Sequence, residues 1–284
     1  MMRSDFAVFV LSHGRASTLK TIPTLLSKNY TGRWYIIVDD EDNQINEYIQ
    51  VWGEEHIIVF NKREVGKTFD IMDNFTGRQV PTFARNAVYD IAKKLGLKYF
   101  FEADDDLVNF RFRVVDDTGS LKTVYIQNMD EVITAYLEYM DSAPIDILAF
   151  GQTGDLIGGK QSKLFSKIFL RKAMQGFFVR VSNPIQYVGR FNDDVNAYVH
   201  AGKVGYLLIT FRDAIMDTLP TQVNKGGITE NYLKYGTYVK SFYSVMLEPS
   251  AVSIDVMGDG NYRIHHSISW NNAVPKIISD KYKK

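Results

Sequence analysis

Apolar residues in the first sixty positions form short continuous runs separated by stretches with helical spacing. The runs at residues 6–11, 34–38 and 57–60 are rich in β-branched and aromatic side chains, which predicts strands buried on both faces. Between them, apolar residues recur at helical spacing from Leu19 to Leu26 and from Ile45 to Trp52. This alternation predicts an α/β fold with a mostly parallel, twisted sheet flanked by helices.

The rest of the chain continues the alternation less regularly. Apolar spacing and turn signals predict, in order, a helix at 83–95, a strand at 98–102, a hairpin with strands at 110–115 and 122–126, a helix at 129–141, strands at 145–150 and 177–181, a helix at 192–201 and a strand at 205–211. Lys225-Gly226-Gly227 predicts a flexible loop. No repeat or Pro/Gly-rich linker divides the sequence, so we expect one domain over residues 1–284.

Composition excludes several kinds of site. The chain of 284 residues contains no cysteine, which rules out disulfides, thiolate zinc sites and a cysteine nucleophile. Its 33 basic and 33 acidic residues balance, whereas a dedicated nucleic-acid binder is usually basic overall. The apolar run at 6–11 is too short for a signal peptide, and no run reaches the roughly 18–20 residues that span a bilayer. We therefore expect a cytoplasmic protein with no membrane partner.

One segment departs from this charge balance. Between Leu156 and Asn192 there are seven basic residues and no acidic one: Lys160, Lys163, Lys167, Arg171, Lys172, Arg180 and Arg190. Several Phe and Tyr residues lie in the same segment. Positive charge combined with aromatic side chains is typical of a groove that binds nucleic acid and an extruded base, although the aromatic residues suit a core equally well.

The most informative motif is the acidic run Asp104-Asp105-Asp106, directly after the strand predicted at 98–102. Successive residues of an extended segment point to opposite sides, so Asp104 and Asp106 can face one way together. Two carboxylates at the ligand-binding edge of a parallel sheet suit Mn²⁺ or Mg²⁺, which complete their coordination with phosphate oxygens and water. A solvated acidic turn is the alternative interpretation.

Polar residues follow the other predicted strands as well. Ser12-His13-Gly14-Arg15 follows the first strand, Asp39-Asp40-Glu41-Asp42 follows the second, and Lys62 comes just after the third. The carboxyl ends of parallel strands meet at one edge of a sheet, where ligands bind. These residues therefore predict a nucleotide site at that edge.

Taken in this order, the motifs resemble those of GT-A glycosyltransferases. The similarity covers residues 5–110 and includes Ala84-Arg85-Asn86 at a helix start. A second similar motif is Asn192-Asp193-Asp194, which precedes a predicted helix. Within that group the chain is most similar to the TET-associated and phage glycosyltransferases, which act on hydroxymethylated pyrimidines in DNA. The resemblance implies a single GT-A-like domain, with a nucleotide-sugar-binding half at about 1–110 and an acceptor half at 111–284.

The resemblance also implies a UDP-sugar donor site at these strand ends. Side chains of the first polar loop would face the base and phosphates, and acidic residues after the second strand would accept hydrogen bonds from base or ribose. Arg85, at a helix start whose free N–H groups favour anions, would contact the diphosphate or else form a structural ion pair. The candidates for nucleotide-sugar binding are Ser12, His13, Arg15, Asp39, Asp40, Glu41, Lys62, Arg85, Asn86 and Asp105.

Metal and catalytic roles follow from the same resemblance. Asp104 and Asp106 would hold the metal, and many GT-A enzymes add a late histidine, for which His265 or His266 is available. Adjacent residues on a strand point opposite ways, so at most one of the two would reach the metal. Asp194, or its neighbour Asp193, would take the proton of the acceptor hydroxyl in an inverting transfer. Helix capping is the alternative interpretation of this motif, since Asn192 and Asp193 are both good N-cap residues.

The function these observations favour is transfer of a sugar from a UDP-sugar to a 5-hydroxymethylpyrimidine in DNA, most of all 5-hydroxymethylcytosine. Lys160, Lys163, Lys167, Arg171 and Lys172 would bind the double-stranded acceptor. Three alternatives remain open at this point: the same chemistry on a glycan or other small acceptor, a nucleotidyltransferase, and a degenerate member that binds without turnover. The sequence does not indicate the oligomeric state.

Overall fold

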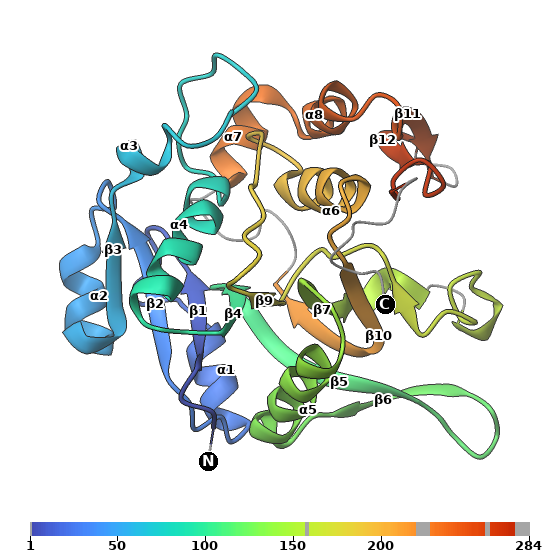
Figure 1. Cartoon of the computed structure of the whole chain (residues 1–284), viewed down its shortest axis with the longest axis horizontal. Helices are drawn as coiled ribbons and strands as arrows, with labels where there is room; N and C mark the ends of the chain where they lie inside the picture. Colours follow the sequence, from blue (N-terminus) through green and yellow to red (C-terminus); the bar gives the residue numbers. More distant parts are fainter. Residues whose placement is uncertain (1, 157–158, 220–227, 259–261, 276–284) are drawn as a thin grey trace.

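The computed structural model describes residues 2–156, 159–219, 228–258 and 262–275 (Figure 1). The loop predicted at residues 225–227 lies outside these ranges. Within them, ten strands form one central sheet in the order β3-β2-β1-β4-β9-β7-β10-β5-β6, with β8 paired to β10. The strands are β1 (Phe6–Leu11), β2 (Trp34–Asp39), β3 (Ile57–Phe60), β4 (Tyr99–Asp104), β5 (Leu107–Val115), β6 (Leu121–Tyr125), β7 (Ile147–Gln152), β8 (Phe169–Leu170), β9 (Phe177–Arg180) and β10 (Leu208–Thr218).

Most of the sheet runs in one direction, as predicted. β3, β2, β1 and β4 are parallel neighbours, and β7 and β10 form a second parallel pair. β9 lies antiparallel between β4 and β7, which sets those two strands in the same direction. β5 and β6 complete the edge as the predicted hairpin and project from the body of the molecule (Figure 1).

Helices cover both faces of the sheet. They are α1 (Thr21–Ser27), α2 (Ile45–Trp52), α3 (Lys62–Val65), α4 (Thr82–Lys94), α5 (Met129–Ser142), α6 (Asp193–Lys203), α7 (Ile228–Tyr235) and α8 (Lys240–Leu247). Short 3₁₀ turns occupy Glu54–His56, Thr153–Leu156, Gly159–Gln161 and Thr237–Val239. None of the helices in the described ranges is long and apolar enough to cross a bilayer.

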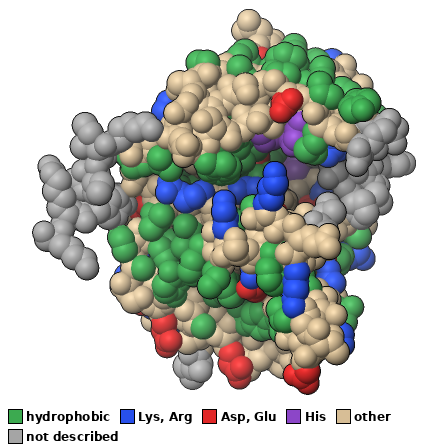
Figure 2. Space-filling model, turned by 90° about the vertical axis from the view of Figure 1, so that its right-hand side faces the viewer, with side chains coloured by type: hydrophobic (Ala, Val, Ile, Leu, Met, Phe, Trp, Pro, Cys, Tyr) green, Lys and Arg blue, Asp and Glu red, His purple; other side chains and the backbone are tan. Residues whose placement is uncertain are grey.

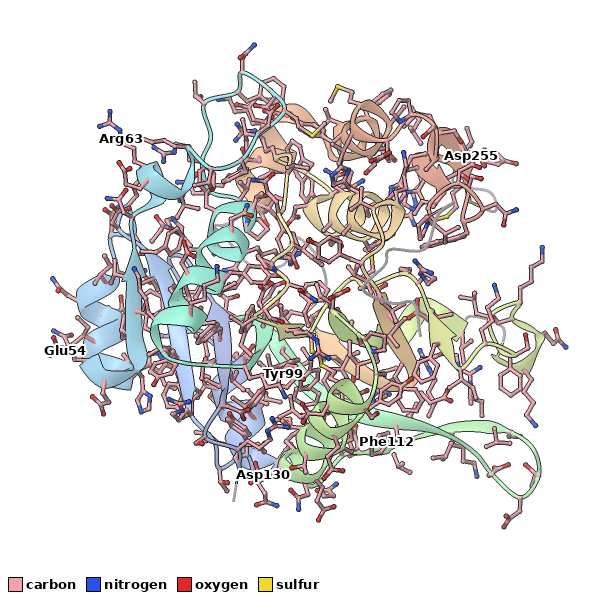
Figure 3. The ribbon with its side chains drawn as sticks, viewed as in Figure 1. Glu54, Arg63, Tyr99, Phe112, Asp130 and Asp255 are labelled. Atoms are coloured by element: carbon pink, nitrogen blue, oxygen red, sulfur yellow. The ribbon has the colours of Figure 1, made fainter. Side chains whose placement is uncertain are left out.

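The alternation of β1 explains why its sequence is apolar throughout. Ala7 and Phe9 belong to the core beneath α4 and α6, whereas Val8 and Val10 belong to the core beneath α1 and α5. A strand covered on both faces has no side chain that needs to be polar. Figure 3 shows Tyr99, at the start of the neighbouring strand β4, near the middle of the molecule.

The C-terminal part differs most from the prediction. Strand β10 begins at Leu208 rather than at residue 205 and continues to Thr218. Helices α7 and α8, and a separate hairpin of β11 (Val252–Met257) and β12 (Arg263–Ile268), were not predicted. The hairpin packs against α8 and is largely exposed, so its sequence carries only a weak apolar pattern.

Candidate active site

A cavity of about 340 Å³ opens at the carboxyl ends of β1, β2 and β4. The predicted site residues that line it are Ser12, His13, Arg15, Asp39, Lys62, Asp104, Asp105 and Asp106. Parallel neighbours bring these strand ends together even though their residues are far apart in sequence. The cavity is large enough for part of a nucleotide-sized ligand.

The three aspartates of the acidic run have different surroundings. Asp104 ends β4, and half of its side chain is exposed. Asp105 is buried, where Oδ2 accepts a 2.6 Å hydrogen bond from Ser12 Oγ and Oδ1 pairs with Arg15 at 2.6 Å. Asp106 is partly buried. Asp105 is therefore occupied by the first polar loop, while its two neighbours keep carboxylate oxygens for other partners.

The electrostatics of Asp106 suit a divalent cation. Burial, followed by repulsion from Asp104 and Asp105, raises the pKa of the Asp106 carboxyl to about 7. A bound cation would relieve this repulsion and stabilise the charged form. Within the described ranges no group of three or more His, Cys, Asp or Glu side chains is arranged to hold a metal. The protein would thus supply two carboxylates, and phosphate oxygens and water the remaining ligands.

A second network joins the ends of β1 and β2 across the cavity. His13 Nδ1 lies 2.7 Å from Asp39 Oδ2, and Lys62 Nζ lies 3.1 Å from Asp39 Oδ1. The hydrogen bond to Asp39 raises the pKa of His13, which favours its protonated form. Because Asp39 already accepts from both cations, His13 and Lys62 are the groups that can donate to a ligand here. Asp39 thus holds these two donors and also lines the cavity, so its expected role as an acceptor for base or ribose stays a prediction.

Asp40 and Glu41, the two other residues after β2 that were predicted to bind the nucleotide sugar, do not line the cavity. Asp40 Oδ1 accepts a 2.9 Å hydrogen bond from the backbone N–H of Lys62, which fixes the turn after β3. Glu41 pairs with Arg78 at 2.9 Å. Both side chains therefore support the loops around the cavity in this structure.

Arg85 and Asn86, in the first turns of α4, also lie outside the cavity lining. Asn86 Nδ2 donates to the carbonyl oxygens of Thr82 and Tyr187 at 2.9 and 2.8 Å, and its Oδ1 accepts from the Tyr187 N–H at 3.0 Å. Arg85 is buried among carboxylates, so the structure places it in the ion-pair arrangement considered as the alternative to diphosphate binding.

Asp193 and Asp194 open α6 and differ in their accessibility. Asp193 is buried and lies 3.2 Å from Arg85 Nη1. Asp194 is partly exposed, and its Oδ1 accepts a 2.7 Å hydrogen bond from the Val195 N–H. Burial, then the charge of Asp193, raises the pKa of Asp194 to about 6, within the range useful for a general base. Asn192 has a left-handed backbone and makes no side-chain cap, so the capping role considered for it is not observed.

The two late histidines lie on β12, and neither lines the cavity that contains the acidic run. His266 Nδ1 is 3.2 Å from Asn192 Nδ2. Burial, followed by the neighbouring His265, Lys240 and Lys172, lowers the pKa of His266 to about 4. The described residues contain no cluster that combines either histidine with Asp104 and Asp106, so the predicted third metal ligand is not found in this structure. The late position of these histidines in the sequence did not indicate where they lie in the fold.

The basic segment is divided between surface and core. Lys160, Lys163 and Lys167 are exposed, whereas Lys172 pairs with Asp155 at 3.0 Å. Arg171 is partly buried. Of the aromatic residues in the segment, Phe177, Phe178, Tyr187 and Phe191 are core residues. Figure 2 shows Lys and Arg side chains gathered in a hollow beside histidine side chains on one face of the molecule.

Several cavity residues were not predicted. Gln152 ends β7 and Thr218 ends β10, so the rule that ligands meet strand ends would have found both. Met174 and Gln175 lie in an irregular segment with no such signal. Glu102 lies outside the cavity lining, buried on β4 two residues before Asp104, and it was not predicted because its neighbours form a continuous apolar strand.

Comparisons with solved structures return distantly similar proteins. Residues 1–349 of TarS from S. aureus match with 12% identity and a TM-score of 0.44 over 75% of this chain and 59% of that chain. Glucosyl-3-phosphoglycerate synthase from Mycobacterium tuberculosis, solved with Mg²⁺ and UDP, matches with 8% identity and a TM-score of 0.45 over 93% of this chain and 87% of that one. Similarity this low does not identify a substrate. No curated protein matches.

The comparison with protein-family models gives a match over most of the chain. The model of the TET-associated glycosyltransferases matches residues 6–227, which include the whole of the cavity's acidic run and the start of α6. This match extends over more than half of the chain and bears out the resemblance seen in its motifs. The chain therefore belongs to the TET-associated glycosyltransferase family and is a glycosyltransferase.

Proposed function

We propose that this enzyme transfers a sugar of the glucose or arabinose type from a UDP-sugar to the hydroxyl group of a 5-hydroxymethylpyrimidine in phage DNA, most of all 5-hydroxymethylcytosine. The observation that carries the donor part is the cavity itself. Its wall combines cationic donors, His13 and Lys62, with the carboxylates of Asp104 and Asp106. A diphosphate that carries a divalent cation is complementary to both kinds of group.

The residues present fit a divalent metal. Asp104 and Asp106 would hold Mn²⁺ or Mg²⁺, which when bound supplies Lewis-acid stabilisation of the leaving diphosphate. His13 and Lys62 would donate hydrogen bonds to the nucleotide and orient it. We assign Asp194 as the general base, because it is accessible and its pKa of about 6 leaves it charged near neutral pH.

In the transfer, the acceptor hydroxyl oxygen bonds to the anomeric carbon while the bond from that carbon to the diphosphate oxygen breaks. The hydroxyl proton passes to a carboxylate, for which Asp194 is the first choice and Asp193 the second. Asp193 is the weaker candidate since it is buried and paired with Arg85. Positioning of both substrates, rather than covalent chemistry by the protein, would provide most of the rate enhancement.

The DNA acceptor rests on a separate observation. Lys160, Lys163 and Lys167 are exposed, and the segment between Leu156 and Asn192 that contains them has no acidic residue. Such a surface suits a phosphate backbone, and the family's name connects it with modified bases. A glycan acceptor would not need this positive charge. The family match also favours sugar transfer over nucleotidyl transfer.

The decisive experiment is mass spectrometry of DNA that contains 5-hydroxymethylcytosine, after incubation with Mn²⁺ and a panel of UDP-sugars. We expect a mass increase of one sugar residue on the modified base with at least one donor. DNA with unmodified cytosine is the matched control and should stay unchanged. Release of UDP with no sugar on either DNA would refute the acceptor, and release of pyrophosphate from nucleoside triphosphates would refute the reaction class.

A further inference from the structure

A buried ion cluster lies behind the cavity wall and includes Glu102, for which no role was predicted. Its centre is Arg85, on the first turn of α4. Arg85 Nε lies 3.3 Å from Glu102 Oε1, Nη2 lies 3.7 Å from Asp104 Oδ1, and Nη1 lies 3.2 Å from Asp193 Oδ2. The side chains of Arg85, Glu102 and Asp193 are 6%, 2% and 7% exposed, so water screens these charges very little.

The guanidinium group of Arg85 also contacts two aromatic rings, in addition to the three carboxylates. Its central carbon lies 5.2 Å from the centroid of the Phe177 ring and 5.6 Å from that of Tyr187. Aromatic rings at this distance attract the cation and restrict its position. Three carboxylates surround the planar guanidinium at ion-pair distance, although Nε and Nη1 make no aligned hydrogen bond, and the compact ammonium of Lys could not approach all three.

The three carboxylates come from the two halves of the site. Glu102 and Asp104 are two residues apart on β4, so they lie on the same side of the strand and can both reach Arg85. Asp193 opens α6, far along the chain, next to the proposed base Asp194. Asp104 belongs to both environments, since it contacts the buried cluster and also lines the cavity.

We infer that Arg85 is a positioning residue that fixes the carboxylate of Asp104 relative to the Asp193–Asp194 pair, with Glu102 as its anchor in the sheet. This inference rests on the proposed function, which assigns Asp104 to the metal and Asp194, next to Asp193, to the acceptor hydroxyl. The 3.7 Å separation from Asp104 is the longest of the three, which leaves that carboxylate able to serve a cation. Partners of metal-binding carboxylates at this remove commonly change metal affinity or activity by about 10- to 100-fold when mutated.

The test compares Arg85→Lys with Arg190→Lys. Arg190 is also a buried arginine paired with an aspartate, at 2.7 Å from Asp73, and none of its contacts reach the cavity. For each variant, Mn²⁺ affinity in the presence of UDP is measured from the free-Mn²⁺ electron paramagnetic resonance signal, together with the melting temperature. Steady-state kinetics then give kcat and the KM for each substrate.

Arg85→Lys should weaken Mn²⁺ binding and lower kcat by about 10-fold or more each, with a smaller change in the KM for the acceptor. Arg190→Lys should lower the melting temperature but leave Mn²⁺ affinity within about twofold of the wild type. A fall in melting temperature alone for Arg85→Lys, with Mn²⁺ affinity and kcat kept, would overturn the inference. Glu102→Gln, which removes the anchor's charge at constant size, should move the same quantities in the same direction if Arg85→Lys fails to fold.

The outcomes separate this inference from the proposed function. If the wild-type enzyme binds Mn²⁺ with UDP but never modifies hydroxymethylated DNA, the acceptor is wrong, and the Mn²⁺ measurements on Arg85→Lys still decide the positioning role. If the wild-type enzyme modifies the DNA and Arg85→Lys does so equally well with unchanged Mn²⁺ affinity, the proposed function stands and the positioning role is refuted.

Discussion

Arg15 and Asp105 form an ion pair of 2.6 Å that commits the middle carboxylate of the acidic run to the first polar loop. The same carboxylate accepts a hydrogen bond from Ser12, whose hydroxyl is also 2.7 Å from that of Tyr48. The three aspartates of the acidic run therefore have different roles. Asp105 ties β4 to the loop after β1, and only Asp104 and Asp106 remain for a cation.

Asp106→Asn should abolish metal-dependent turnover. The substitution keeps the size of the side chain but removes the charge that a divalent cation requires, and a metal's Lewis-acid role is worth several kcal/mol in the transition state. We expect UDP release to fall by ~100-fold or more and Mn²⁺ affinity to fall with it. Kinetics over a range of Mn²⁺ concentrations measure both effects, and turnover close to the wild-type rate would contradict the metal assignment.

Asp105→Asn should affect stability more than metal binding. It keeps the group that accepts from Ser12 but removes the charge facing Arg15, so the partly buried guanidinium loses this charged contact. Loss of one partner of such a hydrogen-bonded pair costs about 1–3 kcal/mol of the free energy of unfolding. Urea denaturation measures the cost. If stability were unchanged while Mn²⁺ binding disappeared, Asp105 would itself be the ligand.

The pKa of Asp106 predicts how the metal-free protein responds to pH. Burial and then its two acidic neighbours raise this pKa from the ordinary 3.8 to about 7, so the folded state binds a proton more tightly than the unfolded state does. The contribution of this group to stability is therefore fully present below about pH 4 and is lost as the pH rises through 7.

Mn²⁺ should reverse this trend, because it binds the deprotonated carboxylate. Its affinity should rise with pH up to about 7, and binding below that pH should release a proton. Calorimetry in buffers with different ionisation enthalpies counts the proton. Asp106→Asn is the control, and an affinity independent of pH between 5 and 8 in the wild-type enzyme (the range over which carboxyl groups of raised pKa titrate) would count against Asp106 as a ligand.

Asp194→Asn should separate sugar transfer from donor binding. Asp194 lies outside the cavity lining, so Mn²⁺ and UDP affinity should be kept while transfer to the acceptor falls by about 100- to 10,000-fold, the usual contribution of a general base. In the wild-type enzyme, kcat should rise with pH through about 6 as Asp194 loses its proton. A variant that transfers sugar normally would shift the base role to Asp193 or to neither.

The sequence predicts those features of the site that are determined by neighbouring residues in the chain, and it does not predict those that depend on contacts between distant segments. The strand at Phe6–Leu11 and the polar residues that follow it are local features, so both the strand and its place at the cavity are found from the pattern alone. The contact of Arg85 with Asp193 joins α4 to α6 and depends on packing that no local pattern encodes. The position of His265 and His266 depends on how a short exposed hairpin packs against the rest of the protein, which no local pattern encodes either.

The DNA acceptor is tested most directly by reversing charge on the exposed part of the basic segment. Lys163→Glu with Lys167→Glu leaves the Lys172–Asp155 pair intact and should weaken binding to hydroxymethylated DNA by about 10-fold or more. Each lost phosphate contact should also reduce the slope of log affinity against log salt by about 1.

Lys93→Glu with Lys94→Glu is the matched control, because it makes the same change in net charge on exposed residues at the end of α4. A general effect of net charge would weaken DNA binding equally in both variants, whereas a specific surface would be affected only by the first. UDP release without DNA should be unchanged in both, since neither pair lines the cavity. DNA affinity and salt dependence that stay at the wild-type level in both variants would mean that the acceptor approaches the Asp193–Asp194 pair by another route, or that it is not a polyanion.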